Sequence, residues 1–342
     1  MDKKRFISEL KQGDIVEGIY VVIKARLGTS KNGPYWDLEF QDKTGRITGK
    51  IWHPLSDNYK EIKEDSFVKI KGHVDNFREN LQVIVNEFDY ANEEEINLDE
   101  LIPSSDPPPE QLIIELENLC FENLKFKPWR RLCGLILNDN YIRQRLMMLP
   151  AAINVHHVYR GGLLEHTLSV CKLSLDIAKN YKDVDREIIL VGALLHDIGK
   201  IKEYEGNISY NVTDSGRLLG HIILGLSMID PYINKVKGLD EDLILHLKHI
   251  IASHHGEYEF GSPKRPKTKE AFIVHVADNV DAKIAMMSLA TEGLEEKGEN
   301  WSRYMKFLER KIFKPSHTNE FLEQNESPKK RSFEECLLPL KE

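Results

Sequence analysis

Apolar residues in the N-terminal part of the chain occur in short runs that alternate with polar residues. Five of these runs are rich in β-branched and aromatic side chains, which favours strands. The five runs are Val16–Ile23, Tyr35–Phe40, Ile47–Trp52, Phe67–Val74 and Leu81–Phe88. Turn-forming stretches such as Lys31-Asn32-Gly33-Pro34 separate them. A short polar helix is expected at Ser56–Ile62, between the third strand and the fourth.

The order of these elements predicts a particular small fold. Three strands, a helix and two further strands is the order of an OB-fold, a five-stranded Greek-key barrel. We therefore expect residues 1–91 to form an all-β domain. Basic and acidic side chains are equally numerous in this region. A nucleic-acid site on the barrel would therefore depend on where the charges lie rather than on their sum.

The pattern changes after the barrel. Residues 92–110 are first acidic and then proline-rich, which is typical of an extended, rather stiff linker. From there apolar positions recur at helical spacing, first in Gln111–Phe121, Trp129–Leu137 and Asn140–Leu149. Helix is expected to follow helix from Gly162 to Ile312, so residues 111–312 form the second predicted domain. Residues 313–342 are polar and weakly periodic, and are interpreted as a flexible tail.

Composition limits the class of protein without identifying it. Apolar residues make up 41% and charged residues 30% of the 342 positions, as in ordinary globular proteins. No apolar run reaches the roughly 18 residues that a membrane span needs. The four cysteines are far apart and form no CxxC pair, which suits a reducing compartment. We therefore expect a cytoplasmic protein without a membrane partner. The net charge of -8 argues against nucleic-acid binding by bulk charge alone.

Histidines and aspartates interrupt the apolar runs of the helical region. A single buried histidine is usually a core residue with one hydrogen bond. An adjacent imidazole and carboxylate at the end of a wholly apolar helix is costlier to bury without a partner. His196-Asp197 occupies such a place, after the run Ile188–Leu195. The complete set of candidate metal ligands is His166, His196, Asp197, His221, His254 and Asp278.

These ligand types predict the kind of metal site. Imidazole and carboxylate suit borderline or hard divalent cations, and no cysteine joins the set. Six ligands are enough for two ions with open positions for water and substrate, and Asp197 is the natural bridging carboxylate. Two ions held close together can clamp a phosphate. We expect two divalent ions per chain, with manganese the first choice and iron, cobalt, zinc or magnesium also compatible.

Other residues near the candidate ligands have alternative interpretations. His255 adjoins His254, and either or both could bind metal. Asp281 shares a helix face with Asp278 and could orient a ligand. Arg160 could hold a phosphate through both guanidinium nitrogens, or could equally form a surface ion pair. His157, shortly before the first ligand, is a further candidate.

The order His166, His196-Asp197, Asp278 resembles the signature of the HD superfamily of metal-dependent phosphohydrolases. His221 and His254 match its two-metal version. The resemblance covers roughly residues 125–312 and implies an all-α fold and hydrolysis of phosphoesters. It also implies that Lys200, which follows His196-Asp197 in LLHDIGK, lies near the substrate phosphate.

A narrower resemblance covers almost the whole chain. The barrel, the acidic linker and the stretches AAINVHHVYRGGLLEHTLSV and LLHDIGK are similar to the YhaM type of 3′-to-5′ exoribonuclease. That family implies manganese-supported trimming of RNA or single-stranded DNA from the 3′ end, with nucleoside 5′-monophosphates as products. The chain also resembles, more weakly, the HD domain of some relaxases, but those proteins lack this N-terminal barrel.

The sequence thus predicts a barrel that guides a single strand to a hydrolytic helical domain. Candidate catalytic residues are Asp197, Lys200 and Arg160. OB-folds bind single strands through aromatic and basic side chains. The candidates here are Tyr35, Trp36, Trp52, Lys24, Arg26 and Lys50. Trp36 could instead lie in the barrel core, and the barrel could mediate homo-oligomer contacts. Two other functions remain open: a phosphohydrolase of small nucleotides, and a non-catalytic nucleic-acid-binding adaptor.

Overall fold

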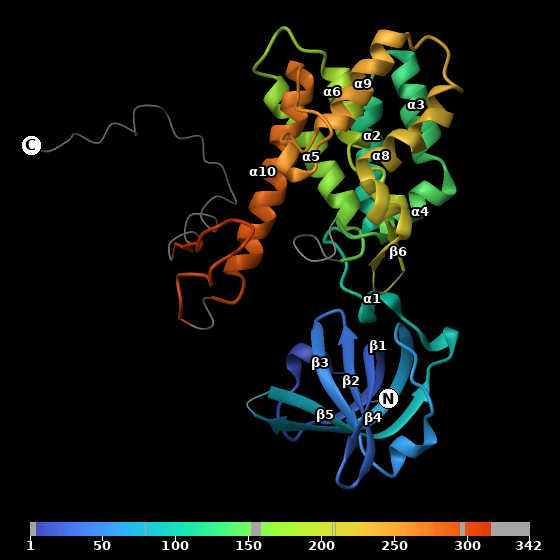
Figure 1. Cartoon of the computed structure of the whole chain (residues 1–342), viewed down its shortest axis with the longest axis vertical. Coiled ribbons are helices and arrows are strands. Elements are labelled where there is room, and N and C mark those ends of the chain that lie inside the picture. The colour runs from blue at the N-terminus through green and yellow to red at the C-terminus, as the bar shows by residue number, and fades with distance from the viewer. Residues whose placement is uncertain are drawn as a thin grey trace, which may run out of the picture. The chain divides into compact units, whose positions relative to one another are not determined.

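The protein is described by a computed structural model. It describes residues 5–78, 80–151, 159–206, 208, 210–294 and 298–315. The chain divides into two compact units, Met1–Ala282 and Lys283–Glu342. The first unit contains the strands and most of the helices, coloured from blue to orange in Figure 1.

The first five strands form a closed barrel in which the strand order is β1-β2-β3-β5-β4. The strands are β1 (Ile15–Ser30), β2 (Gly33–Asp42), β3 (Gly45–Ile51), β4 (Ser66–Phe77) and β5 (Asn80–Tyr90). Neighbouring strands pair antiparallel except β3 and β5, which pair parallel and close the barrel. All five predicted strands are confirmed. Four extend beyond both ends of the predicted run, while β3 begins before its run and ends one residue short of Trp52.

Alternation along the strands separates the inside of the barrel from its outer face. In β2 the side chains of Trp36, Leu38 and Phe40 are buried. Asp37 and Glu39, between them, are only partly covered. Successive side chains of a strand point to opposite faces, so the apolar set fills the barrel and the polar set faces outward. The predicted helix at Ser56–Ile62 is wrong in type and length, because only a 3₁₀ turn, η2 (Leu55–Asn58), forms there.

The segment after the barrel is only partly extended. It contains a 3₁₀ turn, η3 (Glu93–Glu95), and a short helix, α1 (Leu98–Leu101). Leu101 and Ile102 are buried against Val21 and Ile23 of β1. The backbone N–H of Lys43 donates to the carbonyl of Glu100. The prediction of an extended linker is therefore wrong for residues 98–102, because their apolar side chains pack on the barrel.

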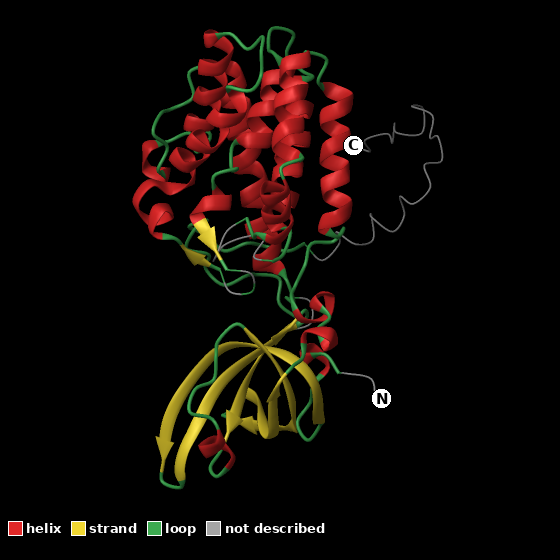
Figure 2. Cartoon of the chain, turned by 90° about the vertical axis from the view of Figure 1, so that its right-hand side faces the viewer, coloured by secondary structure: helices red, strands yellow, loops and turns green. Residues whose placement is uncertain are grey.

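The helical region, in which helices are drawn red in Figure 2, is built around one apolar core. Its helices are α2 (Pro109–Asn123), α3 (Lys127–Leu137), α4 (Asn140–Met148), α5 (Gly162–Ala178), α6 (Arg186–Leu195), α7 (Lys200–Glu203), α8 (Asp214–Ile233), α9 (Glu241–Ser253) and α10 (Lys269–Thr291). The side chains from Ile188 to Leu195 in α6 are all buried, as the apolar run predicted. Helix α6 is thus the centre of the core, and its end lies inside the protein.

Two parts of this region differ from the prediction. A two-stranded sheet, β6 (Tyr204–Glu205) and β7 (Asn211–Val212), separates α7 from α8. The last described helix ends at Thr291 rather than near Ile312. In the second unit, Trp301 pairs with Phe313 and Met305 with Arg310 in isolated β-bridges. Of the predicted tail, residues 316–342 lie outside the described residues.

Candidate metal centre and nucleic-acid interface

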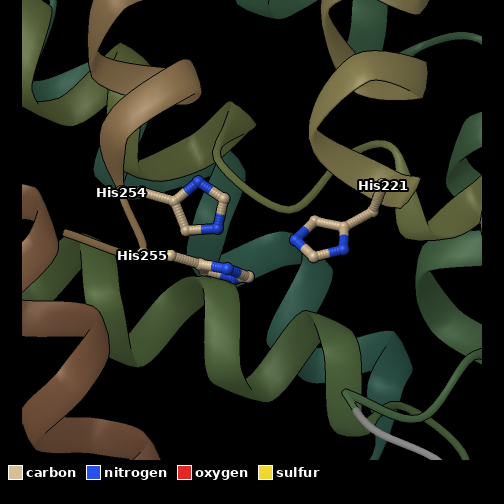
Figure 3. Close-up of side chains that lie close together, drawn as sticks. All are labelled: His221, His254 and His255. Carbon is tan, nitrogen blue, oxygen red and sulfur yellow. The ribbon is translucent and has the colours of Figure 1, made fainter. Parts of the chain in front are cut away.

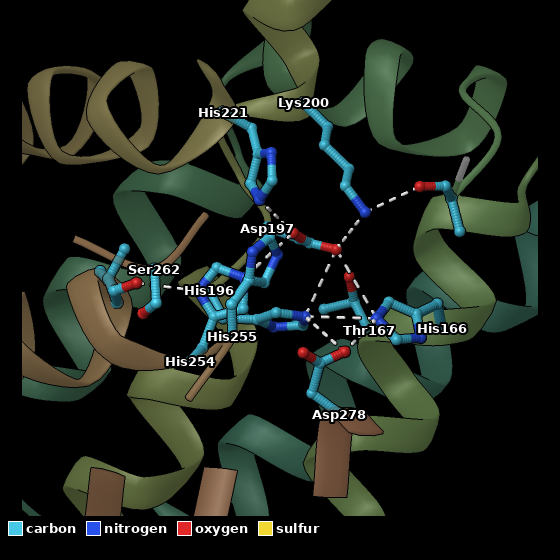
Figure 4. Close-up of polar contacts among 12 residues, drawn as sticks. His166, Thr167, His196, Asp197, Lys200, His221, His254, His255, Ser262 and Asp278 are labelled. Atoms are coloured by element: carbon cyan, nitrogen blue, oxygen red, sulfur yellow. Dashed lines mark hydrogen bonds and ion pairs between the residues drawn. The ribbon is translucent and has the colours of Figure 1, made fainter. Parts of the chain in front are cut away.

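The six predicted metal ligands come together at one place in the helical region (Figure 4). His166 comes from α5, and His196-Asp197 directly follows α6. His221 comes from α8, His254 directly follows α9, and Asp278 comes from α10. Within the described residues, two ligand groups are close enough to hold an ion: His166, His196 and Asp197, and His221, His254 and His255.

The Nδ1 atoms of the histidines are all held by neighbouring groups. The Nδ1 of His196 lies 2.7 Å from the carbonyl of Ala193, and that of His254 lies 2.8 Å from the carbonyl of Ile251. A carbonyl only accepts, so each of these rings donates from Nδ1 and keeps a lone pair on Nε2. Outer partners of this kind fix the tautomer and the orientation of metal-binding histidines.

The Nδ1 atoms of the remaining three imidazoles also have neighbouring partners. His166 Nδ1 lies 2.6 Å from Asp281 Oδ2, and His221 Nδ1 lies 3.3 Å from Glu203 Oε2. His255 Nδ1 donates to the carbonyl of Phe260 at 2.7 Å. The rings of His254 and His255 lie next to each other, and that of His221 faces them (Figure 3). Both His254 and His255 are therefore placed to bind metal.

Asp197 lies between the two ligand groups. Its Oδ2 is 3.6 Å from His166 Nε2 and 3.4 Å from His196 Nε2. Its Oδ1 is 3.4 Å from His221 Nε2 and 3.6 Å from His254 Nε2. Each carboxylate oxygen thus faces a different group, as a bridging ligand would. Asp278 joins the first group, because its Oδ1 is 3.2 Å from His166 Nε2.

Three buried polar atoms at this centre lack a hydrogen-bond partner in the described part of the chain: Asp197 Oδ1, His221 Nε2 and His254 Nε2. Since the proton of His254 is on Nδ1, its Nε2 lone pair points at a carboxylate oxygen. Two acceptors that face each other in a buried site are costly without a cation between them. The donor set is imidazole and carboxylate, which fits a divalent cation.

Protonation in the cluster agrees with this donor set. Burial lowers the pKa of His254, and burial together with the charge of His254 lowers the pKa of His255 to about 4. Both rings are therefore neutral near pH 7, as ligands must be. Burial opposes charge on Asp197, but Lys200 and His196 outweigh it and hold its pKa well below the usual range.

His166 differs, because two carboxylates contact it. Burial disfavours its charged form, but hydrogen bonds to Asp278 and Asp281 outweigh burial and raise its pKa to about 9. A cation that binds Nε2 must displace this proton, so metal binding releases a proton at neutral pH. Ser169 also donates to Asp281. Asp281 thus contacts the ring of His166, as a residue that orients this candidate ligand would.

Lys200 is buried beside Asp197. Its ammonium group donates to Asp197 Oδ2 at 2.6 Å and to the carbonyl of Ala151 at 2.7 Å. Burial opposes its charged form, but Asp197 outweighs burial and raises the pKa of Lys200. Lys200, Asp197, His166 and Asp278 all line a cavity of about 210 Å³. The lysine therefore remains charged at the wall of the space in which a substrate would meet the ligands.

Sequence reasoning missed two residues that place His221. Glu203 contacts the ring of His221 and also accepts from its backbone N–H at 3.2 Å. Gly220, with φ 71° and ψ 160°, breaks α8 directly before His221. This left-handed φ is one that glycine adopts readily. The break changes the direction of the chain, so that His221 is the first residue of the second helical segment of α8.

Gly199 lets the backbone after Asp197 approach α8 closely. It lies beyond the end of α6 at Leu195 and has φ -68°. A Cβ on Gly199 would lie 1.8 Å from the carbonyl oxygen of His221 and 2.5 Å from the backbone N of Gly225. Only glycine permits this approach of the backbone to α8.

Two further candidates lie apart from the ligand groups. Arg160 forms ion pairs with Asp99 at 3.2 Å and with Glu110 at 2.7 Å. Of the two predicted roles of Arg160, these contacts match the surface ion pair. They also occupy the guanidinium group that was the candidate for holding a phosphate. His157 lies outside the described residues.

Five of the six residues predicted to contact nucleic acid lie on the outer face of the barrel. Lys24, Arg26 and Lys50 line a shallow hollow over β1, β2, β3 and β5, with a volume of about 540 Å³. Tyr35 and Trp52 pack on each other with ring centroids 4.9 Å apart, and Lys50 lies over the Tyr35 ring. Lys24 and Lys50 also form ion pairs with Glu39 and Asp37.

Trp36 is a correction to that set. It is 5% exposed, and its indole N–H donates to the carbonyl of Tyr59 at 3.2 Å. Its position in β2 directs the ring into the barrel, so it cannot serve as an outer stacking platform. Phe77 and Leu81 are exposed apolar residues that line the same hollow, as does Arg78.

Comparison with known families agrees with this architecture. Residues 163–283 match the HD domain family, and residues 15–89 match the OB-fold nucleic acid binding domain. The protein therefore consists of an OB-fold barrel followed by a helical HD domain, as predicted. HD domains are metal-dependent hydrolases, and OB-folds of this family bind nucleic acid. In the described part of the chain, no helix has both the length and the apolar character of a membrane span.

Two of the solved structures that resemble part of this chain are the following. The second OB-fold domain of replication protein A from Methanococcus maripaludis is 24% identical over 27% of this chain and 97% of its own, with a TM-score of 0.23. PriB from Ralstonia solanacearum is 6% identical over 23% of this chain and 97% of its own, with a TM-score of 0.21.

Proposed function

We propose that this protein is a metal-dependent 3′-to-5′ exonuclease that acts on single-stranded RNA, and also on single-stranded DNA, and releases nucleoside 5′-monophosphates. The observation that carries the proposal is the set of three unpartnered buried atoms around Asp197, at a cavity in the HD domain of a chain that also has an OB-fold. The resemblance of almost the whole chain to YhaM-type enzymes, based on sequence stretches such as LLHDIGK, supports the direction of trimming.

The ligands divide into two sets that share Asp197. His166, His196, Asp197 and Asp278 would hold one ion, and Asp197, His221, His254 and His255 would hold the other. Bound divalent ions supply positive charge to the phosphodiester and lower the pKa of water. The first choice is manganese, because the family resemblance implies it and the donor set accepts it.

The protein's own residues would orient the metal ligands and neutralise charge on the phosphate. Asp281 and Glu203 hold the rings of His166 and His221, so that each Nε2 points toward Asp197. Lys200 keeps its charge at the cavity wall, where it would offset negative charge that develops on the phosphate in the transition state. Asp197 carries two roles, because it holds Lys200 while it bridges the ligand groups.

The barrel would supply affinity for the strand. Tyr35 and Trp52 offer aromatic faces at one end of the outer surface, and Lys24, Arg26 and Lys50 follow along it. Stacking and phosphate contacts of this kind bind single strands with little sequence preference. The acidic partners of Lys24 and Lys50 keep the surface from being strongly positive, so we expect tight binding only when several contacts form together.

The test is an assay with 5′-labelled single-stranded RNA and the full-length protein, with manganese, with magnesium and with chelator. A ladder that shortens from the 3′ end only with metal is expected. Asp197→Asn should abolish it, while Asp99→Asn, a change in an exposed acidic residue, should not. RNA that stays intact under all conditions would refute the proposal. Hydrolysis of free nucleotides instead would identify a small-nucleotide phosphohydrolase.

A further inference from the structure

One face of α10 forms a wall of the metal-site cavity. His275, Asp278, Asn279 and Ala282 all line it, and they are spaced as neighbours on one helix face. Asp278 is a ligand, but the other three are not. The Nδ1 of His275 is held by the carbonyl of His254 at 2.7 Å. In the described residues, neither His275 Nε2 nor the Asn279 amide has a polar partner, so this wall offers unused hydrogen-bonding groups.

Phe260 lies at the mouth of the same cavity. It ends the 3₁₀ turn η4 (Tyr258–Phe260), and its carbonyl accepts from His255. The residue is 65% exposed although it lines the cavity. Within the described structure its ring has no aromatic or cationic partner. The ring of Tyr258, two residues earlier, is also exposed but has a cationic partner, because the Arg265 guanidinium lies 5.1 Å from its centroid. The Phe260 ring, at a polar cavity, has no such contact within the described residues.

The size of the cavity limits what it can enclose. Pockets that bury a whole small molecule are roughly 300–1,000 Å³. The volume here is about 210 Å³, which leaves room for a phosphate and part of a sugar. The base of a nucleotide whose phosphate lies at the ligands must therefore remain near the mouth of the cavity. The exposed ring found there is that of Phe260.

We propose that Phe260 is a stacking platform for the base of the terminal nucleotide, and that the α10 wall, through Asn279 and His275, faces the sugar of that nucleotide. This rests on the proposed function, since it assigns the substrate's 3′-terminal nucleotide to the metal-site cavity. Every base has an aromatic face, so Phe260 would recognise a nucleotide without selecting its sequence. The reaction could then trim strands of any composition.

The experiment compares two single-stranded RNA oligonucleotides that differ only at the 3′ end, one with an ordinary nucleotide and one with an abasic residue. The measured quantity is kcat/KM for removal of that first residue by the manganese-loaded enzyme. Wild type should favour the ordinary end by roughly 5- to 150-fold, the factor that loss of one base stack corresponds to. Phe260→Ala should bring the ratio close to one, and Phe260→Trp should retain it.

Tyr258→Ala is the matched control, because it removes an exposed ring from the same turn but not from the cavity. It should leave the ratio at the wild-type value. A Phe260→Ala enzyme that still discriminates as wild type does would overturn the inference, and so would a wild-type enzyme that removes both ends equally fast. Failure of wild type to cut either oligonucleotide would instead refute the proposed function.

Discussion

Metal should stabilise the HD domain and leave the barrel unchanged. Three buried atoms around Asp197 lack hydrogen-bond partners among the described residues. Each such atom costs about 1–3 kcal/mol, so the three together cost roughly 3–9 kcal/mol that a bound cation can recover. An ion at 100 times its Kd contributes about 2.7 kcal/mol to the free energy of unfolding. The smallest estimated cost of the three unpartnered atoms, about 3 kcal/mol, is therefore already as large as this gain from metal binding.

Hydrogen exchange measures this effect region by region. A gain of about 2.7 kcal/mol corresponds to roughly 100-fold slower exchange of amides that open only on unfolding of the domain. Peptides from α6 and α9 should slow by about this factor when manganese is added, while peptides from β1 to β4 should not. The barrel contains none of the metal-facing residues, so it serves as an internal control.

Two variants on one stretch of chain sharpen the test. His254→Gln removes an unpartnered ligand atom, so the metal-induced slowing should fall sharply. His249→Gln changes a histidine of α9, the helix that His254 follows. The Nε2 of His249 accepts from the backbone N–H of Lys267, so the metal-induced slowing of exchange should persist in this variant. Exchange that slows equally in both domains, or in neither, would show that the unpartnered atoms do not form a cation site.

Three further changes probe residues around the site and on the barrel. Asp281→Ala removes the partner of His166 Nδ1 and should weaken manganese binding roughly 10- to 100-fold by calorimetric titration, whereas unchanged affinity would contradict an orienting role. Gly199→Ala places a Cβ 1.8 Å from the carbonyl of His221, so the protein should lose metal in elemental analysis, and full metal content would show that α8 can give way. Lys24→Ala should lower the salt slope of single-strand binding by about 0.7 in fluorescence anisotropy if this lysine contacts a phosphate, and an identical slope would place the strand elsewhere.

Much of the fold could be predicted because one face of each element is apolar. The five strands were found from short β-branched runs, and α6 from eight successive apolar residues. The helix predicted at Ser56–Ile62 failed because its sequence has few apolar positions, and the Ser56 hydroxyl instead donates to the carbonyl of Pro34 in β2. That contact spans 22 residues of sequence, and no local pattern contains it.

The metal ligands were predictable for a similar reason, and their supports were not. A histidine or aspartate inside an apolar run is conspicuous, since burial without a partner is costly. Glu203 does not stand out in the sequence, because it lies in a polar stretch. It contacts His221 only because α8 lies beside α7 in the fold. Trp36 shows the reverse problem, because alternation alone did not decide which face of β2 is inside.

Two of the ligands share a local arrangement that links the sequence to the chemistry. His196 follows a wholly buried helix, and His254 follows a helix whose buried residues lie mainly in its last turns. Each Nδ1 donates to the carbonyl three residues before it. Carbonyls in the last turn of a helix lack partners within the helix, so the imidazole satisfies one of them. The same bond fixes the tautomer that leaves a lone pair on Nε2. A helix whose apolar run ends in histidine can thus satisfy its own end and present a metal ligand with one side chain. In this chain α6 and α9 both do so, and Asp197, next to the first of these histidines, faces them both.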